Sequence, residues 1–223
     1  MNNKVLAFIP ARANSKGVKN KNIRKLNGKP LISWTIDFAK KLDFVDFIVI
    51  SSDSLKIKKI AKEKKVDFIL RPDHLSADES KVESSLIYTL ENFKKRDLVE
   101  YILLLEPTSP FREKKTVKRC LEILKKKKNN YSVFTVCGTD KLFFQKKKDI
   151  FSPIFKNQKR RRQDRCQIYY ECGVVYCLRF KEFKKRKKIL NKTSFAYEVN
   201  EVEAIDINTN TDFKIAELLC KKK

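Results

Sequence analysis

Short apolar runs alternate with amphipathic segments through the first two-thirds of the chain. Runs such as Val5–Pro10 and Tyr101–Leu105 are almost wholly apolar, as is typical of strands that are buried on both faces of a sheet. Between them, segments such as Leu31–Leu42 carry apolar residues at helical spacing. This alternation predicts an α/β fold, a Rossmann-like three-layer sandwich in which helices cover both faces of a mostly parallel sheet. The predicted strands are Val5–Pro10, Phe47–Ile50, Val66–Leu70, Tyr101–Leu105, Tyr131–Val136 and Gly173–Phe180, and the predicted helices are Leu31–Leu42, Ser54–Lys65, Ser80–Phe93, Lys114–Lys126 and Thr211–Leu219.

The alternating pattern breaks in residues 139–170, which are basic and rich in aromatic side chains. We expect one domain over residues 1–223, with 139–170 as a small excursion from the sheet. Its phenylalanines would form an apolar interface with a second subunit, giving a homodimer, and its arginines would reach the neighbouring subunit's site. The alternative is a lid that closes within one chain.

The length of 223 residues and the hydrophobic content of 42% are compatible with one domain and a sizeable core. No apolar run approaches the roughly 18 residues that a membrane-spanning helix needs, so we expect no membrane association. The first residues, MNNKVLAFIPAR, are interpreted as the first strand and not as a signal peptide, because no small-residue cleavage site follows them. We therefore expect the protein in the cytoplasm.

The six cysteines form no CxxC pair, and His74 is the only histidine. A zinc site and a cysteine–histidine nucleophile both need such residues in groups, so the sequence argues against both. In a cytoplasmic protein we expect reduced and mostly buried thiols.

The formal net charge of +25 is extreme and admits three interpretations. Such a charge can indicate a nucleic-acid-binding protein. It can also reflect lysines on solvent-facing surfaces, or it can attract anionic substrates. The lysine runs fall at predicted helix ends, in loops and in the C-terminal tail, and they are not interleaved with aromatic residues on one face. We therefore favour solvent-facing lysines and predict no nucleic-acid partner.

The segment Ala11–Asn22 follows the first predicted strand and carries four cationic side chains. Ligands of open α/β sheets bind beyond the carboxyl ends of the strands. The segment matches neither the GxGxxG pattern nor a P-loop. A triphosphate would suit it, because Arg12 can fork onto phosphate oxygens while Lys16 and Lys21 act as point charges. The alternative is a solvated basic loop.

Asp206 and Asn208 stand two positions apart before the last predicted helix. Strand residues at this spacing share a face, and Mg²⁺ prefers hard oxygen ligands together with phosphate and water. Asn208 could equally cap the helix. The PTSP turn that follows Glu106 is expected to fix that residue at the sheet edge. Arg112 is either a surface cation or the partner of a carboxylate, and Asp53 is expected to cap the helix that follows it.

Six blocks of the sequence stand out together and span nearly the whole chain. They are IPARANSKGVKNKN with GKPLISWTI, SSDS at 51–54, LRP at 70–72 with LSAD at 75–78, LLLEPTSPFR at 103–112, RQD at 162–164 with GVVY at 173–176, and AIDINTNTDF at 204–213. In this order they resemble the motifs of the acylneuraminate cytidylyltransferase family. Members of that family join CMP from CTP to sialic, legionaminic or pseudaminic acid, use Mg²⁺, and are usually dimers with a Rossmann-like sheet. The resemblance implies a cytidylyltransferase that acts on CTP and a nine-carbon acidic sugar.

Carried over position by position, the resemblance implies three groups of site residues. The nucleotide-binding group is Ala11, Arg12, Asn14, Ser15, Lys16, Lys21, Asn22, Arg71, Asp78 and Ser80. The sugar-binding group is Glu106, Thr108, Ser109, Arg112, Arg162, Gln163 and Tyr176. Asp206 and Asn208 would hold Mg²⁺, and the catalytic residues would be Arg12, Lys21 and Asp206.

The sequence departs from the family pattern at four positions. Glu106 stands where the family usually has glutamine, and Asn208 replaces the commoner aspartate. Cys172 stands where an asparagine usually precedes the glycine, and Val82 aligns with a serine of the nucleotide segment. We expect these changes to affect the identity of the sugar more than the class of reaction.

The resulting hypothesis is nucleotidyl transfer, in which the anomeric hydroxyl of the sugar attacks the α-phosphorus of CTP and pyrophosphate leaves. Catalysis would consist of positioning and of neutralising charge on phosphate oxygens. The proton acceptor is left open between Asp206, a metal-bound hydroxide and water. The alternatives are a nucleotidyltransferase for an eight-carbon ulosonic acid or a sugar phosphate, a basic nucleic-acid-binding protein, and a catalytically inactive scaffold.

Overall fold

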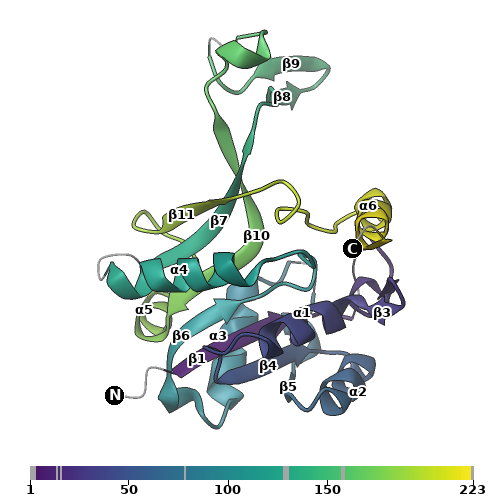
Figure 1. Cartoon of the computed structure of the whole chain (residues 1–223), viewed down its shortest axis with the longest axis vertical. Coiled ribbons are helices and arrows are strands. Elements are labelled where there is room, and N and C mark those ends of the chain that lie inside the picture. Colours follow the sequence, from purple (N-terminus) through teal and green to yellow (C-terminus); the bar gives the residue numbers. More distant parts are fainter. Residues whose placement is uncertain are drawn as a thin grey trace.

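A central sheet organises the computed structural model, which describes residues 4–13, 15, 17–77, 79–127, 131–156 and 159–221. The sheet has seven strands in the order β11-β7-β10-β6-β1-β4-β5 (Figure 1). β10 pairs antiparallel with both of its neighbours, and the other neighbouring strands pair parallel. The strands of this sheet are β1 (Lys4–Pro10), β4 (Phe47–Ser52), β5 (Asp67–Leu70), β6 (Val99–Leu104), β7 (Ser132–Thr139), β10 (Ile168–Arg179) and β11 (Phe195–Val199).

Helices cover both faces of the sheet (Figure 1). They are α1 (Leu31–Lys40), α2 (Leu55–Glu63), α3 (Val82–Asn92), α4 (Lys114–Lys126), α5 (Phe180–Arg186) and α6 (Asn210–Lys221). Helices α1, α2 and α4 bury residues such as Ile36, Ala61 and Leu121 against one face, and α3 and α5 bury Leu86 and Phe183 against the other. The predicted α/β sandwich with a mostly parallel sheet is therefore confirmed. None of the helices in the described part of the chain is long and apolar enough to cross a membrane.

Smaller elements complete the described structure. A two-stranded hairpin of β2 (Lys25–Leu26) and β3 (Lys29–Pro30) packs beside α1 and α6. Four short 3-10 helices are η1 (Lys21–Ile23), η2 (Asp73–Leu75), η3 (Arg96–Leu98) and η4 (Arg162–Asp164). The apolar cluster around Leu26, Leu31 and Phe213 holds α6 against this corner of the molecule, so the segment before α6 lies close to the loop after β1.

Among the strands of the seven-stranded sheet and the helices that cover it, β11 and α5 were not predicted from the sequence. β11 is an edge strand whose side chains alternate between partly buried and exposed before the buried Val199, so it lacks the continuous apolar run of the central strands. α5 buries a single side chain, Phe183, among lysines and an arginine, which leaves little helical periodicity to recognise. β10 begins at Ile168, earlier than the predicted Gly173, because its first residues are mostly exposed.

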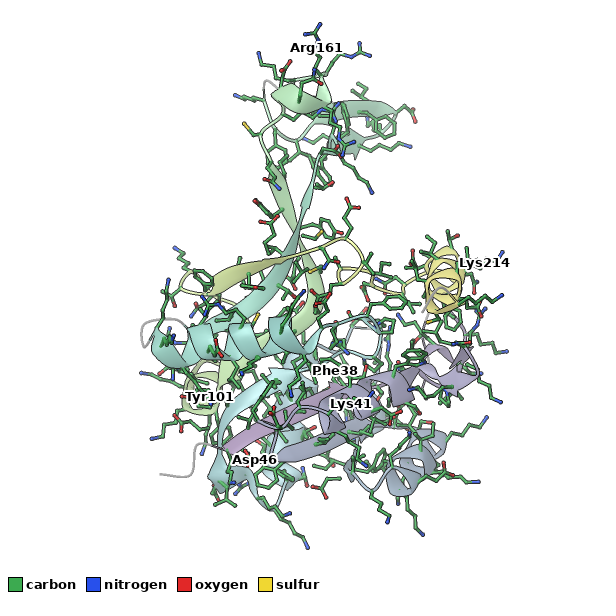
Figure 2. All side chains as sticks on the ribbon, in the orientation of Figure 1. Phe38, Lys41, Asp46, Tyr101, Arg161 and Lys214 are labelled. Carbon is green, nitrogen blue, oxygen red and sulfur yellow. The ribbon has the colours of Figure 1, made fainter. Side chains whose placement is uncertain are left out.

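β7 and β10 continue beyond the sheet as a ribbon that carries a second hairpin away from the body of the molecule (Figure 1). This hairpin consists of β8 (Phe144–Lys147) and β9 (Ile150–Pro153). We call residues 139–170 the arm, and Arg161 lies at its far end (Figure 2). Large apolar side chains of the arm are exposed, with 73% of the Ile150 surface and 63% of the Phe151 surface open to solvent. The predicted excursion from the sheet is therefore present.

The parallel strands β1, β4, β5 and β6 end at one edge of the sheet. Their last residues are Pro10, Ser52, Leu70 and Leu104, so the loops that follow these strands are neighbours in space. This is the edge at which open α/β sheets bind ligands.

Candidate active site

A cavity of about 290 Å³ opens at this edge and is lined by segments from distant parts of the chain. We call it the first cavity. Its lining consists of Pro10, Arg12, Ser15, Lys21, Asn22, Arg71, Leu75, Ala77, Ser80, Val82, Ser85, Glu106, Pro107, Thr108, Asp206 and Asn208. The structure thus brings the cations that follow β1 and the oxygen-bearing residues that precede α6 onto one cavity.

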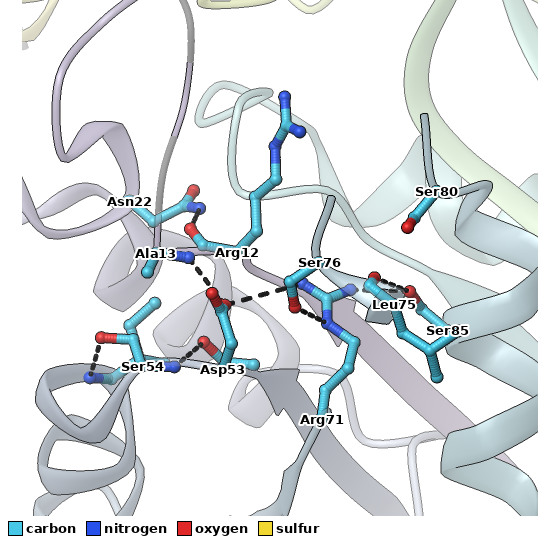
Figure 3. A network of polar contacts seen from close by, with 12 residues as sticks. Arg12, Ala13, Asn22, Asp53, Ser54, Arg71, Leu75, Ser76, Ser80 and Ser85 are labelled. Carbon is cyan, nitrogen blue, oxygen red and sulfur yellow. Dashed lines mark hydrogen bonds and ion pairs between the residues drawn. The ribbon is translucent and has the colours of Figure 1, made fainter. Parts of the chain in front are cut away.

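Backbone contacts fix the loop after β1. The Ala11 N–H donates to the Ser51 carbonyl at 2.9 Å, and the Asn22 side-chain amide donates to the Arg12 carbonyl at 2.9 Å. The Ala13 N–H donates to Asp53 Oδ1 at 2.8 Å. Figure 3 shows the contacts of Asn22 with Arg12 and of Ala13 with Asp53, and the Arg12 side chain extending away from them. The backbone on both sides of Arg12 is therefore anchored while its guanidinium lines the first cavity.

Asp53 does not cap the helix that follows, which corrects the prediction. Ser54 is the residue before α2, and its hydroxyl accepts a hydrogen bond from the Ile57 N–H at 3.4 Å. Asp53 Oδ1 instead accepts from Ala13 and lies 3.9 Å from an Nη atom of Arg71. Asp53 therefore joins the loop after β1 to the segment after β5 (Figure 3).

Arg71 is held in place by two serine hydroxyls in addition to Asp53. Its Nε donates to Ser76 Oγ at 3.0 Å and its Nη1 to Ser85 Oγ at 2.7 Å. Only 5% of its surface is exposed, and this burial lowers the pKa of Arg71, an effect that the Asp53 charge opposes. Ser80 lies nearby, where its hydroxyl donates to the His74 carbonyl at 2.7 Å. This wall therefore presents a fixed arginine and small polar groups to the first cavity.

Lys21 ties the loop after β1 to the segment before α6. Its Nζ donates to the Ile207 carbonyl at 2.7 Å and to Asn208 Oδ1 at 3.1 Å. The Ile207 N–H in turn donates to the Thr108 carbonyl at 2.9 Å. A Cβ at Gly17 would overlap the Asn208 carbonyl oxygen, so glycine permits the close approach of the two segments. Burial lowers the pKa of Lys21, which the Asp206 and Glu106 charges oppose.

Asp206 is the described residue that best fits a metal ion. Its Oδ2 accepts from the Asn208 side-chain amide at 2.5 Å, whereas its Oδ1 is buried and has no hydrogen-bond partner among the described residues. A buried oxygen without a partner is unfavourable unless an ion or a ligand occupies its vicinity. No group of three or more His, Cys, Asp or Glu side chains suited to a metal occurs in the described ranges. The donor set therefore suits Mg²⁺ that is bound by one carboxylate, with phosphate and water as the remaining ligands.

The turn after β6 is held by Arg112 and fixes Glu106. Arg112 donates through Nε to the Val174 carbonyl at 2.9 Å, through Nη1 to Thr35 Oγ1 at 2.9 Å, and through Nη2 to the Glu106 carbonyl. It is 5% exposed, and burial lowers its pKa to about 10. Arg112 is therefore neither a surface cation nor open to a sugar carboxylate, which corrects both predicted roles.

A second cavity, of about 410 Å³, adjoins the first. Its lining consists of Lys81, Val82, Glu83, Leu104, Glu106, Glu171, Tyr176, Lys187, Lys188, Ile189 and Leu190. The Tyr176 hydroxyl donates to Glu171 Oε1, and burial raises the pKa of Tyr176. Val82 and Glu106 line both cavities, so a molecule in one cavity would meet a molecule in the other beside these two side chains.

Comparison with known proteins decides the family. Residues 6–223 match the sequence model of a family described as cytidylyltransferase. The chain belongs to this family. The CMP-N,N'-diacetyllegionaminic acid synthase of Legionella pneumophila is 32% identical over 229 residues, which cover 97% of this chain and 96% of the relative. The N-acylneuraminate cytidylyltransferase of Escherichia coli is 27% identical over 227 residues, which cover 100% of this chain. The chain spans only 54% of the length of the E. coli protein.

The cytidylyltransferase family resemblance found in the sequence is thereby confirmed, and the fold agrees with it. A solved CMP:2-keto-3-deoxy-manno-octonic acid synthetase complexed with CTP aligns with 99% of this chain and 100% of its own, at a TM-score of 0.75 and 12% identity. A 4-diphosphocytidyl-2C-methyl-D-erythritol synthase aligns over 99% of each chain, at a TM-score of 0.75 and 9% identity. At such low identity these structures show a shared fold alone.

Several residues predicted for the cytidylyltransferase site lie elsewhere. Arg162 and Gln163 line a separate cavity at the base of the arm, and Arg162 pairs with Asp140. Ser109 is buried and donates its hydroxyl to the Gly173 carbonyl at 3.3 Å. Ala11 is buried, and its N–H donates to the Ser51 carbonyl. Within one chain these four residues therefore line neither the first nor the second cavity. The predicted Asn14, Lys16 and Asp78 fall outside the described residues.

Some residues that line the two cavities or hold their walls were not singled out from the sequence. Ser85 and Ser76 hold Arg71, and Glu171 and Lys188 line the second cavity. Serines in a loop or an amphipathic helix carry no pattern of their own, so no local signal singled out Ser76 or Ser85. Glu171 lies next to Cys172. The departure from the family pattern at Cys172 was the one sequence signal that could have drawn attention to Glu171.

Proposed function

We propose that this chain transfers CMP from CTP to the anomeric hydroxyl of a nonulosonic, sialic-acid-like sugar and releases pyrophosphate. One observation carries the proposal: Arg12 and Lys21 open onto the same cavity as Asp206. Membership of the cytidylyltransferase family supports it, as does the name of the Legionella relative, which matches this chain over nearly its whole length.

The first cavity is proposed to bind CTP. Arg12 and Lys21 would neutralise charge on the phosphates and on the leaving pyrophosphate, and Arg71 and Ser80 would border the cytidine. Asn14, Lys16 and Asp78 remain nucleotide-site candidates on the family resemblance. Asp206 Oδ1 would hold Mg²⁺, which supplies charge neutralisation on the phosphates when it is bound. Asn208 would orient Asp206, since its amide oxygen already accepts from Lys21.

The second cavity is proposed to bind the sugar acid. Lys81, Lys187 and Lys188 line it and can attract a carboxylate. Tyr176 and Glu171 supply hydroxyl and carboxylate groups that can bond to sugar hydroxyls and amides. Because Glu106 borders both cavities, the sugar hydroxyl would meet the α-phosphate beside it.

The arm is proposed to make the protein a homodimer. Its exposed Phe144, Ile150 and Phe151 would be covered by a second copy, and Arg162 and Gln163 would then reach the partner's sugar cavity. Sedimentation velocity at working concentration should show a dimer, and exchanging Ile150 and Phe151 for serine should give monomers. A wild-type chain that sediments only as a monomer would remove this part of the proposal.

Pyrophosphate release tests the reaction. The chain is incubated with CTP, Mg²⁺ and a panel of sialic, legionaminic, pseudaminic and eight-carbon ulosonic acids, and with UTP or ATP in place of CTP. We expect CTP-dependent turnover with a nine-carbon acid. Arg12→Ala and Asp206→Ala should each lose about 100-fold or more in kcat, as removing a preorganised electrostatic group does. The matched control is Lys62→Ala on the exposed side of α2, which should keep full turnover. Near-normal turnover in both folded site variants would reject the proposed site.

A further inference from the structure

Glu106 occupies the junction between the two cavities. The two linings share only Val82 and Glu106 among the described residues. Val82 is apolar, so Glu106 is the polar side chain that a reacting group would meet on passing from the second cavity to the first. The residue is also fixed in position, because its carbonyl accepts from Arg112 Nη2 and from the Ser109 N–H at 3.3 Å.

The Glu106 carboxylate differs from those of Asp53, Glu171 and Asp206 because neither of its oxygens accepts a hydrogen bond from a described residue, whereas each of the others accepts at one oxygen. Asp53 accepts from the Ala13 N–H, and Glu171 accepts from the Tyr176 hydroxyl. No residue in the described ranges donates a hydrogen bond to the Glu106 carboxylate. Its Oε2 would lie 3.2 Å from a Cβ at Gly173, so the carboxylate packs against the backbone there and a side chain would crowd it. The carboxylate oxygens are therefore left to accept a hydrogen bond from a substrate.

We propose that Glu106 accepts the proton of the attacking sugar hydroxyl. This inference rests on the proposed function of the two cavities. The hydroxyl O–H bond breaks and its proton passes to the Glu106 carboxylate. The freed electron pair forms the new bond from the sugar oxygen to the α-phosphorus of CTP. The bond from that phosphorus to the pyrophosphate oxygen breaks, and pyrophosphate leaves with the electron pair.

The charges around Glu106 support this role. Burial raises the pKa of Glu106 to about 7, and the Asp206 charge adds to this rise. The charges of Arg112 and Lys21 oppose it, and Glu171 raises it further. A general base is most effective when its pKa lies near the working pH. A glutamine, which the family usually has here, could accept a hydrogen bond from the hydroxyl but could not take up its proton.

The test is the pH dependence of Glu106→Gln, which keeps the shape of the side chain. In the wild-type protein, kcat should rise with pH through an acidic limb near neutrality, because the deprotonated carboxylate is the active form. Glu106→Gln should lose this limb and fall about 100-fold or more in kcat at pH 8. Its half-saturating Mg²⁺ concentration, and its affinity for CTP by calorimetry, should stay within about twofold of wild type, since RT ln 2 is only about 0.4 kcal/mol.

Glu171→Gln is the matched control, because Glu171 lines the same second cavity but already accepts from Tyr176. It should keep the acidic limb, moved toward lower pH because the Glu171 charge no longer raises the pKa of Glu106, whatever its KM for the sugar. An unchanged limb and rate in Glu106→Gln would overturn the assignment. A loss of rate that excess Mg²⁺ restores would also overturn it, because Glu106 would then act as a metal ligand. A wild-type chain that transfers no CMP to any sugar acid would refute the proposed function, and this role with it.

Discussion

Removing the buried carboxylate of Glu203 should destabilise both α4 and the segment that leads to Asp206. Glu203 is 2% exposed, and it accepts from the Glu113 N–H at 2.8 Å and from the Thr116 hydroxyl at 2.9 Å. Glu113 is the residue before α4 and makes no side-chain cap of its own. Glu203 therefore caps this helix from a distant part of the chain, since the first N–H groups of a helix need an acceptor.

The expected loss of stability follows from these two hydrogen bonds. A hydrogen bond to a charged group contributes about 1.5–3 kcal/mol, and the lost burial of the side chain is offset by relief of its desolvation. We therefore expect Glu203→Ala to lower the free energy of unfolding by about 3 kcal/mol. For a chain of this length that loss corresponds to a fall in Tm of about 6–12 °C. Glu203→Gln can still accept from Glu113 and donate to the Thr116 hydroxyl, so its loss should stay within about 1 kcal/mol.

Thermal and urea denaturation followed by circular dichroism would measure these losses, with the exposed Glu201→Ala as control. Burial raises the pKa of Glu203, although the hydrogen bonds from Glu113 and Thr116 lower it. The folded protein thus binds this proton more tightly than the unfolded chain. The stability that Glu203 contributes is greatest at acidic pH and is lost as the pH rises through its folded pKa. Glu203→Gln should therefore gain stability relative to wild type with rising pH. A Glu203→Ala variant within 0.5 kcal/mol of the control would refute the capping role.

Three further variants test the contacts that build the site. Asp53→Ala should raise the KM for CTP about tenfold, equivalent to about 1.4 kcal/mol, because the Ala13 N–H loses its acceptor. Steady-state kinetics would measure the KM, and an unchanged value would argue against the role of Asp53 in anchoring the loop after β1. Gly17→Ala should push the backbone at Asn208 away. Because a small displacement of the site residues can lower the rate strongly, kcat should fall by about 100-fold, and the half-saturating Mg²⁺ concentration should rise. A Mg²⁺ titration like that of the wild type would contradict this expectation. Arg112→Ala should lose about 3–5 kcal/mol of stability in urea denaturation, because buried acceptors lose their donor, and a loss below 1 kcal/mol would show that these contacts contribute little.

The sequence predicted those parts of the fold that have uniform environments. The central strands are apolar throughout because both faces are covered, as in Tyr101–Leu105, and most of the main helices carry a clear apolar stripe. The loop after β1 was recognisable because four cationic side chains follow the end of a strand in a segment without regularly spaced apolar residues. β11 and α5 escaped prediction because an edge strand and a short helix bury few side chains, which leaves their patterns weak.

The contacts that position the site could not be predicted, because they join residues far apart in the chain. Nothing near Asp53 indicates that it accepts from Ala13, 40 positions earlier. Arg112 resembles a surface cation in sequence, yet its donors reach Val174 and Thr35, 62 and 77 positions away. A charged side chain is buried where hydrogen-bond acceptors from distant parts of the chain surround it. The local sequence does not contain this information, so the burial of Arg112 could not be predicted from it.

The bond from Lys21 to Ile207 joins groups 186 positions apart. A ribosome makes Lys21 early and its acceptor much later, so a nascent chain that has emerged only through the central strands holds Arg12 and Lys21 without the carboxylate of Asp206. Closing so long a loop is entropically unfavourable until α6 packs against Leu26 and Leu31. A nascent chain that lacks α6 would therefore hold one wall of the first cavity without the segment that carries Asp206 and Asn208.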